Sequence, residues 1–405
     1  MPSSLQIWFD RLTTTMFSST LAFTFCGLFL LPNGKTILSN LLVISIAIGL
    51  LNFFIGGKRA IGLVDRRLLF VFLGYALFVI LNRFVHGDQY GVARNLIYVA
   101  AFGLLIPRKN IVVHICQYSL IVGGIGFGVL SFWQQSQGIY RVDGFTNAIL
   151  FSQAAFAFVL LNAFVLKNNR KDSAFIASIS LLSIGALLYS LYLSQSRGVW
   201  LALLILTVLF ALKKYFQKPI KYSFVGVFAI VVMMIFYQNS PILQERFNSA
   251  TYDINSAQKG QFATSWGLRM IAWEGAWKGF LDHPLLGVGT NGFDSLKVRQ
   301  VKSGEMSSVI LEHPLAHTHN QYMQNLVIRG FIGLIALLCF LGLPFLWAIK
   351  KNGFLSIAAL YPFTFAIYGL SDVPFEQQNV LYVFSLGLIY LWLSENLNSK
   401  YENEL

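Results

Sequence analysis

The residues best suited to acid–base chemistry are His317 and His319, in the segment His317-Thr318-His319-Asn320. Histidine takes up and releases a proton near neutral pH, so either ring could act as a general base. The segment ends a polar interruption, residues 239–329, in a chain that is otherwise strongly apolar. An arginine-rich polar stretch that ends in this motif beside a membrane suggests chemistry on an anionic, lipid-linked substrate. The competing interpretation is a loop histidine that bonds a backbone carbonyl.

A second candidate group is Ser194-Gln195-Ser196-Arg197-Gly198, which must turn tightly between two apolar segments. Arg197 would stand at the start of a helix, where backbone N–H groups and a guanidinium together favour a phosphate. The alternative is an arginine that extends to lipid headgroups.

Arg269 is a third candidate, and it precedes a stretch with helical periodicity. The expected helix runs through Phe280 on the membrane surface. Its apolar side would be formed by Ile271, Trp273, Ala276, Trp277 and Phe280.

The sequence favours a site that needs neither metal nor nucleotide. His317 and His319 with a carboxylate such as Glu312 could ligate zinc, but no third ligand stands at a recognised spacing. Neither a Walker-type glycine loop nor a Gly-x-Ser-x-Gly segment occurs. ATP would in any case not reach an external site. We therefore expect no cofactor and no bound metal.

The elements that must position these residues are membrane helices. The 405 residues are 56% hydrophobic and 12% charged, with a mean hydropathy of +0.63, whereas soluble domains carry about 25% charged residues. The net charge of +13 does not indicate nucleic acid, because the basic residues lie mainly in short loops between apolar runs, where they orient a membrane protein. The three cysteines fall inside apolar runs and indicate no disulfide.

The expected fold is an all-α polytopic membrane protein with about twelve transmembrane helices and one large, partly helical external loop. Residues 1–238 would hold helices one to nine, residues 239–329 the loop, and residues 330–405 helices ten to twelve with a short tail. The predicted spans are 13–31, 36–56, 67–86, 92–107, 111–133, 149–167, 173–193, 198–213, 221–238, 330–350, 354–371 and 379–396.

Charge distribution predicts the sidedness of these spans. One set of loops holds most of the basic residues, which predicts that this side and both termini are cytoplasmic. The large loop is then external, and its arginines need another explanation than membrane orientation. The opposite short loops hold only Lys35, Arg83, Arg94, Arg141 and Arg197.

Ser-Arg-Gly at the outer start of a span, an arginine in the large loop and His-Asn at its end together resemble the O-antigen ligases, within the O-antigen ligase/polymerase superfamily of Gram-negative inner membranes. Two further similarities are Arg141-Val142-Asp143-Gly144-Phe145 and Phe375-Glu376-Gln377. The resemblance covers most of the chain, and it makes the large loop periplasmic.

The resemblance implies transfer of a finished glycan from undecaprenyl diphosphate to lipid A–core oligosaccharide, with inversion and without metal or ATP. It implies that Arg197 and Arg269 bind the donor diphosphate and that His319 is the general base. Arg141 is expected near the donor and Glu376 near the histidine or the acceptor, although either could simply tie loops together. His317 and Asn320 complete the expected substrate site, and His317 is an additional candidate base.

Two other functions compete with the ligase. An O-antigen polymerase would use the same donor, but none of the external arginines is followed by ten residues and a glycine, a spacing frequent in polymerases. A transporter of an anionic solute would need charged groups within its helices and paired broken helices at the midplane, and the pattern shows neither.

Overall fold

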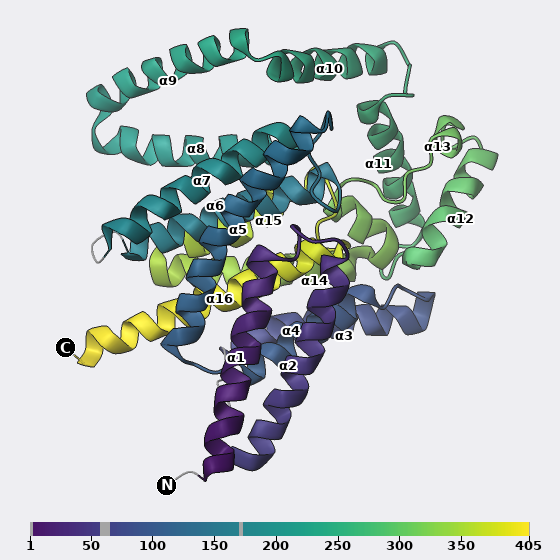
Figure 1. Cartoon of the computed structure of the whole chain (residues 1–405). Coiled ribbons are helices and arrows are strands. Elements are labelled where there is room, and N and C mark those ends of the chain that lie inside the picture. Colours follow the sequence, from purple (N-terminus) through teal and green to yellow (C-terminus); the bar gives the residue numbers. More distant parts are fainter. Residues whose placement is uncertain (1–2, 57–64, 170–172, 405) are drawn as a thin grey trace.

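The computed structural model describes residues 3–56, 65–169 and 173–404, and within these ranges the chain forms only helices and loops (Figure 1). The helices are α1 (Ser4–Cys26), α2 (Gly34–Gly56), α3 (Arg66–His86), α4 (Gly91–Leu105), α5 (Asn110–Ser136), α6 (Ala148–Asn169), α7 (Ala174–Ser194), α8 (Arg197–Gln217), α9 (Pro219–Asn239), α10 (Pro241–Gln258), α11 (Ser265–Asp282), α12 (Gly289–Lys302), α13 (Val309–Glu312), α14 (Gln321–Asn352), α15 (Ile357–Tyr368) and α16 (Gln378–Glu404).

Each of the twelve predicted spans coincides with one helix, namely α1 to α9 or α14 to α16. Among the described residues, nine of these helices are long and apolar enough to cross a membrane: α2, α3, α5 to α9, α14 and α16. Helices α4 and α15 are apolar but have only 15 and 12 residues, and about 20 are needed to span the hydrocarbon layer. Helix α1 is long enough but more polar, since Thr13, Thr14 and Thr15 follow one another in it. The helical architecture therefore has nine candidate spans among the described residues, and the count of twelve stays a prediction.

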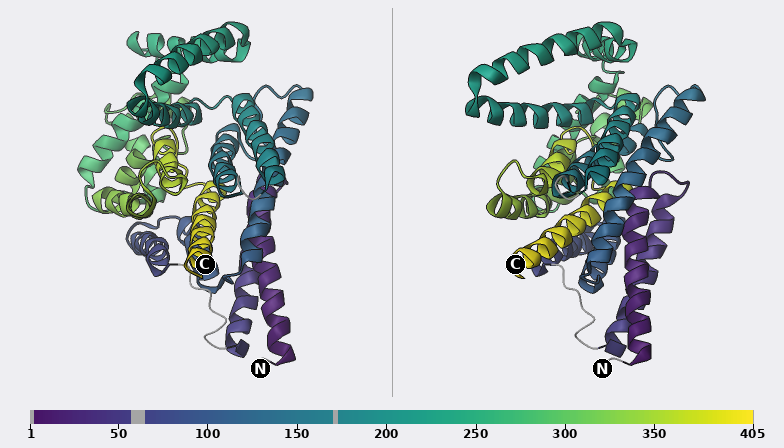
Figure 2. Two further views of the ribbon diagram at one scale, coloured as in Figure 1. Left: turned by 90° about the vertical axis from the view of Figure 1, so that its left-hand side faces the viewer. Right: turned by 60° about the vertical axis from the view of Figure 1, so that its left-hand side comes forward.

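The helices differ greatly in how much of their surface the protein covers. Helices α6 and α16 are central, and 78% of the apolar window of each is buried. Phe127 of α5 and Phe151 of α6 stack with ring centroids 4.4 Å apart in this core. By contrast, no side chain of α9 is buried, and Figure 2 shows α8 and α9 extending away from the bundle as an arm that leads into α10.

The segment predicted as a large loop, 239–329, is mostly helical. It contains α10 to α13 and the first turns of α14, which begins at Gln321 rather than near residue 330. The predicted boundary coincides instead with a kink, where Gly330 has a φ of 64°. A Cβ at Gly330 would come within 2.3 Å of Leu285 O, so only glycine fits. Figure 1 shows both termini on the side of the molecule away from α10 to α13, and the assignment of that segment to the periplasm stays a prediction.

The buried face of α11 differs from the predicted apolar face. Ile271 and Ala276 are buried as expected, but Trp277 is 47% exposed. Gly275 and Gly279 are buried instead, because small residues let the neighbouring elements approach closely. A Cβ at Gly279 would come within 2.4 Å of the Leu296 side chain on α12. This packing fixes the orientation of α11, which carries Arg269.

Candidate functional site

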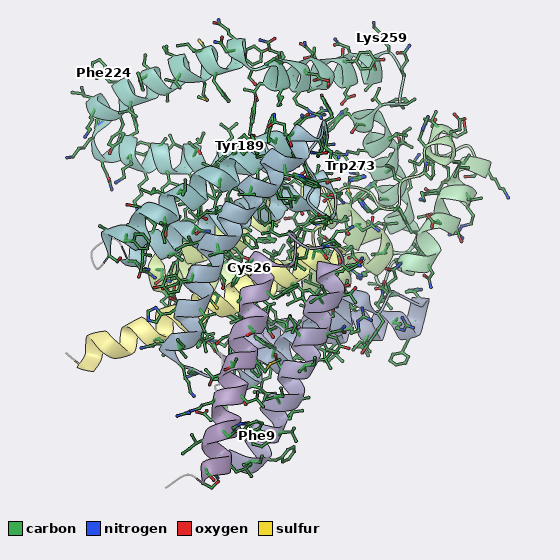
Figure 3. All side chains as sticks on the ribbon, viewed as in Figure 1. Phe9, Cys26, Tyr189, Phe224, Lys259 and Trp273 are labelled. Carbon is green, nitrogen blue, oxygen red and sulfur yellow. The ribbon has the colours of Figure 1, made fainter. Side chains whose placement is uncertain are left out.

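The histidine loop, residues 313–320, is held by hydrogen bonds to its backbone. Trp273 of α11 (Figure 3) donates from Nε1 to Thr318 O at 2.8 Å. Gln324 of α14 accepts from Thr318 N at 2.8 Å. Thr318 is fully buried, and His319 has a φ of 52°, in the left-handed region. Two elements from the segment 239–329 therefore fix the position and direction of the His319 side chain.

Asn320 follows His319 as the N-cap of α14. Its side-chain oxygen accepts hydrogen bonds from Tyr322 N at 3.0 Å and Met323 N at 3.1 Å. A cap of this kind satisfies backbone donors that have no partner within the helix. The structure thus gives Asn320 a helix-capping contact, where the sequence interpretation placed a substrate contact.

Asp372, between α15 and α16, faces His319 and was not predicted as a site residue. The Nδ1 atom of His319 lies 3.4 Å from Asp372 Oδ1, and the Asp372 side chain is only 5% exposed. Gln153 of α6 donates to the other carboxylate oxygen at 3.2 Å. Burial raises the pKa of Asp372, but the close contact with His319 and the nearby charge of His317 lower it below its usual value. The carboxyl group is therefore ionised beside the imidazole.

His317 lies against His319 but presents a different nitrogen. The two ring centroids are 4.2 Å apart, and His317 Nδ1 accepts a hydrogen bond from the backbone N–H of His319 at 3.3 Å. Burial, and then the charge of His319, lower the pKa of His317 to about 4. His317 is thus neutral near pH 7, with Nδ1 already engaged and its proton on Nε2.

Arg269 lies within electrostatic range of this centre, and the arginines predicted from the sequence lie within that range of one another. Burial lowers the pKa of Arg269, and the carboxylate of Asp372 acts in the opposite direction, so these two groups lie within electrostatic range. Arg197 begins α8 and forms an ion pair with Asp253 of α10 at 3.2 Å. Burial also lowers the pKa of Arg141, and the next contributions come from the charges of Arg246 and Arg197.

Arg246 of α10 is a fourth arginine of this cluster, and the sequence interpretation missed it. It donates from Nε and Nη2 to Gln195 Oε1 at 2.8 and 2.5 Å. Arg141 donates from Nε to Ser194 O at 3.2 Å. Both arginines therefore donate hydrogen bonds to the α7–α8 turn, where Gln195 has a φ of 55°. Asp253 is the carboxylate paired with this cluster among the described residues, so the cluster carries an excess of positive charge suited to an anion.

The structure pairs Glu376 with Arg329 rather than with a histidine. Glu376 Oε1 lies 2.5 Å from Arg329 Nη1, and Asp88 Oδ2 lies 2.8 Å from Arg329 Nε. Arg329 is completely buried. This pair agrees with the second possibility weighed from the sequence, a tie between loops, because a buried guanidinium requires acceptors for its N–H groups. A position of Glu376 near the acceptor stays a prediction.

Three side chains of the site offer donors suited to a metal. Single ligand atoms of His317, His319 and Asp372 all lie within 4.8 Å of one another. Two imidazoles and a carboxylate are donors that divalent transition metals accept. The third donor is Asp372, not Glu312 as weighed from the sequence, because the fold brings the 369–377 loop to the histidines.

Comparison with known proteins finds a family model and two relatives that match this chain. The family model described as O-Antigen ligase matches residues 182–338, which hold Arg197, Arg269, His317 and His319. A protein of Haemophilus influenzae described as uncharacterized is 27% identical over 322 residues, or 76% of this chain and 79% of that protein.

An O-antigen ligase of Escherichia coli strain K12 is 26% identical over 232 residues, which cover 54% of this chain and 52% of the relative. The match to the family model and this relative both agree with the resemblance found in the sequence motifs. The chain is therefore similar to the O-antigen ligase family over residues 182–338.

Proposed function

We propose that this protein transfers a glycan from undecaprenyl diphosphate to lipid A–core oligosaccharide at the periplasmic face of the inner membrane. The family match supports a ligase- or polymerase-type transfer between lipid-linked glycans. The observation that carries the proposal is the pairing of His319 with the buried Asp372 beside an arginine cluster that lacks enough acidic partners.

His319 acts as the general base in this proposal. Asp372 approaches Nδ1, which fixes the ring and leaves Nε2 to accept the proton of the acceptor hydroxyl. His317 is less suited, because Nδ1 accepts a backbone N–H and Nε2 carries the proton. A positioned general base contributes about 10²- to 10⁴-fold to the rate.

The arginines act on the leaving group. As the acceptor oxygen bonds to the anomeric carbon, the bond from that carbon to the diphosphate oxygen breaks, and the electron pair stays on undecaprenyl diphosphate. Arg197 and Arg269 stabilise this additional negative charge, and Arg141 and Arg246 hold the rest of the diphosphate. One displacement inverts the anomeric carbon. No metal or ATP is needed, because the diphosphate is already an activated leaving group.

The test uses the purified full chain in proteoliposomes with undecaprenyl-diphosphate glycan and lipid A–core, without added metal or ATP. We expect a product in which the glycan is attached to lipid A–core, detected by gel shift and mass spectrometry. Polymerised donor with unmodified lipid A–core would instead assign the polymerase reaction.

The arginines are tested in the same assay. Arg269→Gln and Arg197→Gln are expected to weaken donor binding and to slow transfer, because each removes positive charge at the diphosphate. The matched control is Arg299→Gln, at the end of α12. An Arg299 variant as defective as the other two would show that the effect is not specific to the site.

A further inference from the structure

An unassigned apolar groove lies between α3 and α14. It has a volume of about 370 Å³ and is lined by apolar side chains of both helices, among them Phe70, Val71, Cys339 and Leu343. Both helices are long and apolar enough to span a membrane. A groove of this kind on spanning helices is filled by lipid, since water does not enter the hydrocarbon layer.

A second cavity adjoins the groove and has charged walls. Its volume is about 280 Å³, and it shares Arg67 and Trp347 with the groove. Arg67 lies over the Trp347 ring, 5.4 Å from the centroid. Trp392 of α16 lines the same cavity, with Arg108 6.0 Å from its ring. Tryptophan and arginine side chains together are typical of the boundary between hydrocarbon and headgroups.

This cavity carries an excess of positive charge. Arg67 is paired with Asp65 at 2.6 Å, and Lys351 with Glu395 at 3.1 Å. Lys350 also lines the cavity, and among the described residues it has no acidic side chain within ion-pair distance. Burial raises the pKa of Asp65, but the hydrogen bonds and charge of Arg67 and the charge of Arg108 lower it. The basic side chains in or beside the cavity therefore outnumber its two carboxylates, Asp65 and Glu395. These basic residues are Arg67, Arg108, Lys350 and Lys351.

The charged cavity lies far from the candidate functional site along α14. Helix α14 is 32 residues long and kinks at Gly330. His319 lies just before its first residue, and Lys350 and Lys351 lie in its last turn. The two sites are therefore at opposite ends of one helix.

We propose that the α3–α14 groove binds an acyl chain of an anionic phospholipid whose headgroup phosphate contacts Arg67 and Lys350. Charge complementarity selects this occupant, because basic pockets between transmembrane helices bind anionic headgroups. A zwitterionic lipid would fill the groove equally well but would gain less from the excess positive charge.

The groove also contacts the buried ion network near the functional site. Tyr75 lines the groove and stacks on Phe340 at 5.0 Å. Its hydroxyl donates to Asn325 at 3.0 Å and accepts from Arg329 Nη1 at 3.2 Å. A bound acyl chain therefore packs beside the side chains that tie α3, α14 and the Glu376 loop together.

Gly74→Leu tests the groove. Gly74 lines the groove, and a Cβ at Gly74 would meet no atom within 4 Å, so the side chain added there begins in open space. The matched control is Gly342→Leu on α14, where a Cβ also meets open space and which does not line the groove. Both changes replace a helical glycine and raise helix propensity equally.

The measurement is native mass spectrometry of the full chain with equimolar phosphatidylglycerol and phosphatidylethanolamine. We expect wild type and Gly342→Leu to retain phosphatidylglycerol preferentially, and Gly74→Leu to bind it at least fivefold more weakly. Arg67→Gln combined with Lys350→Gln should reduce the preference about 25-fold, since each basic residue near a headgroup contributes about fivefold. Lys213→Gln combined with Lys214→Gln, at the end of α8, should not change it.

Three outcomes would overturn the proposal. The groove is not the acyl site if Gly74→Leu binds phosphatidylglycerol as tightly as Gly342→Leu does. The headgroup assignment fails if wild type binds both lipids equally. Saturable binding of soluble glycerol 3-phosphate with the affinity of the lipid would show a phosphate site that does not need an acyl chain.

Discussion

His319 and His317 differ in which ring nitrogen is already engaged, and this difference separates their roles. A backbone N–H occupies Nδ1 of His317, whereas the buried Asp372 carboxylate faces Nδ1 of His319. The sequence presents two equivalent histidines two residues apart. Only the path of the backbone, with His319 in the left-handed region, gives them different partners.

We predict that His319→Asn abolishes transfer and leaves donor binding unchanged. Asparagine tolerates the left-handed backbone and cannot accept the proton, so the turnover rate should fall about 10²- to 10⁴-fold. Single-turnover transfer and equilibrium binding of the donor measure the two effects separately. The control is His313→Asn, an exposed histidine of the same loop. A dead His317→Gln variant together with an active His319→Asn variant would reverse the assignment.

The low pKa of His317 predicts a loss of stability in acid. The folded chain holds this pKa at about 4, against an ordinary value of 6.5. Between these values the unfolded chain binds a proton that the folded chain does not, so the free energy of unfolding decreases as the pH falls from about 6.5 to about 4. The full shift corresponds to at most about 3 kcal/mol. Thermal unfolding at pH 7.5 and 4.5 should show a smaller loss for His317→Gln than for wild type, whereas His313→Gln should match wild type.

At the scale of elements, the buried ion network of Arg329 connects three parts of the chain. Asp88 follows α3, Arg329 lies in α14, and Glu376 precedes α16. Thr290 at the start of α12 also donates to Asp88. Gln321, the first residue of α14, donates to Glu376 at 3.4 Å and accepts from Phe375 N at 2.9 Å. The network therefore fixes the loop that carries Asp372 relative to the helix that follows His319.

Arg329→Met should destabilise the protein by about 3–5 kcal/mol, because it leaves two buried or half-buried carboxylates without their cation. The control is Lys278→Met, whose partner Glu274 is 66% exposed and whose loss should cost about 1 kcal/mol or less. Thermal unfolding in detergent compares the two variants. Equal melting temperatures would contradict a structural role for the network.

The sequence predicts the helices much better than it predicts their partners. A span is recognised from its own apolar run, so each of the twelve predicted spans overlaps a helix. Helix α14 begins at Gln321, before the Gly330 kink, whereas the predicted span begins at residue 330. Asp372 lies 53 positions after His319, and nothing in its local pattern marks it as the histidine's partner. Arg246 likewise joins the cluster only because α10 folds back over the α7–α8 turn. Glu376 and Asn320 stand beside motif residues, and their actual contacts are an ion pair and a helix cap.

At the scale of the whole molecule, a metal requirement distinguishes two possible uses of the same side chains, proton transfer and metal binding. Both use His317, His319 and Asp372. We expect transfer to continue after dialysis against EDTA, since the diphosphate leaving group and the arginine cluster supply the chemistry. Residual metal is measured by mass spectrometry in the same sample. Activity that disappears with EDTA and returns with zinc would replace the general-base mechanism.

No side chain of helix α9 is buried, and this has a practical consequence. The packing of the protein does not depend on the identity of most of the 21 side chains of α9. It depends only on the apolar character and the length of this segment. Residues 223–233 should therefore be exchangeable for a plain leucine–alanine sequence, which makes α9 the natural place to insert a spectroscopic label or to vary the lipid contact without altering the catalytic chemistry.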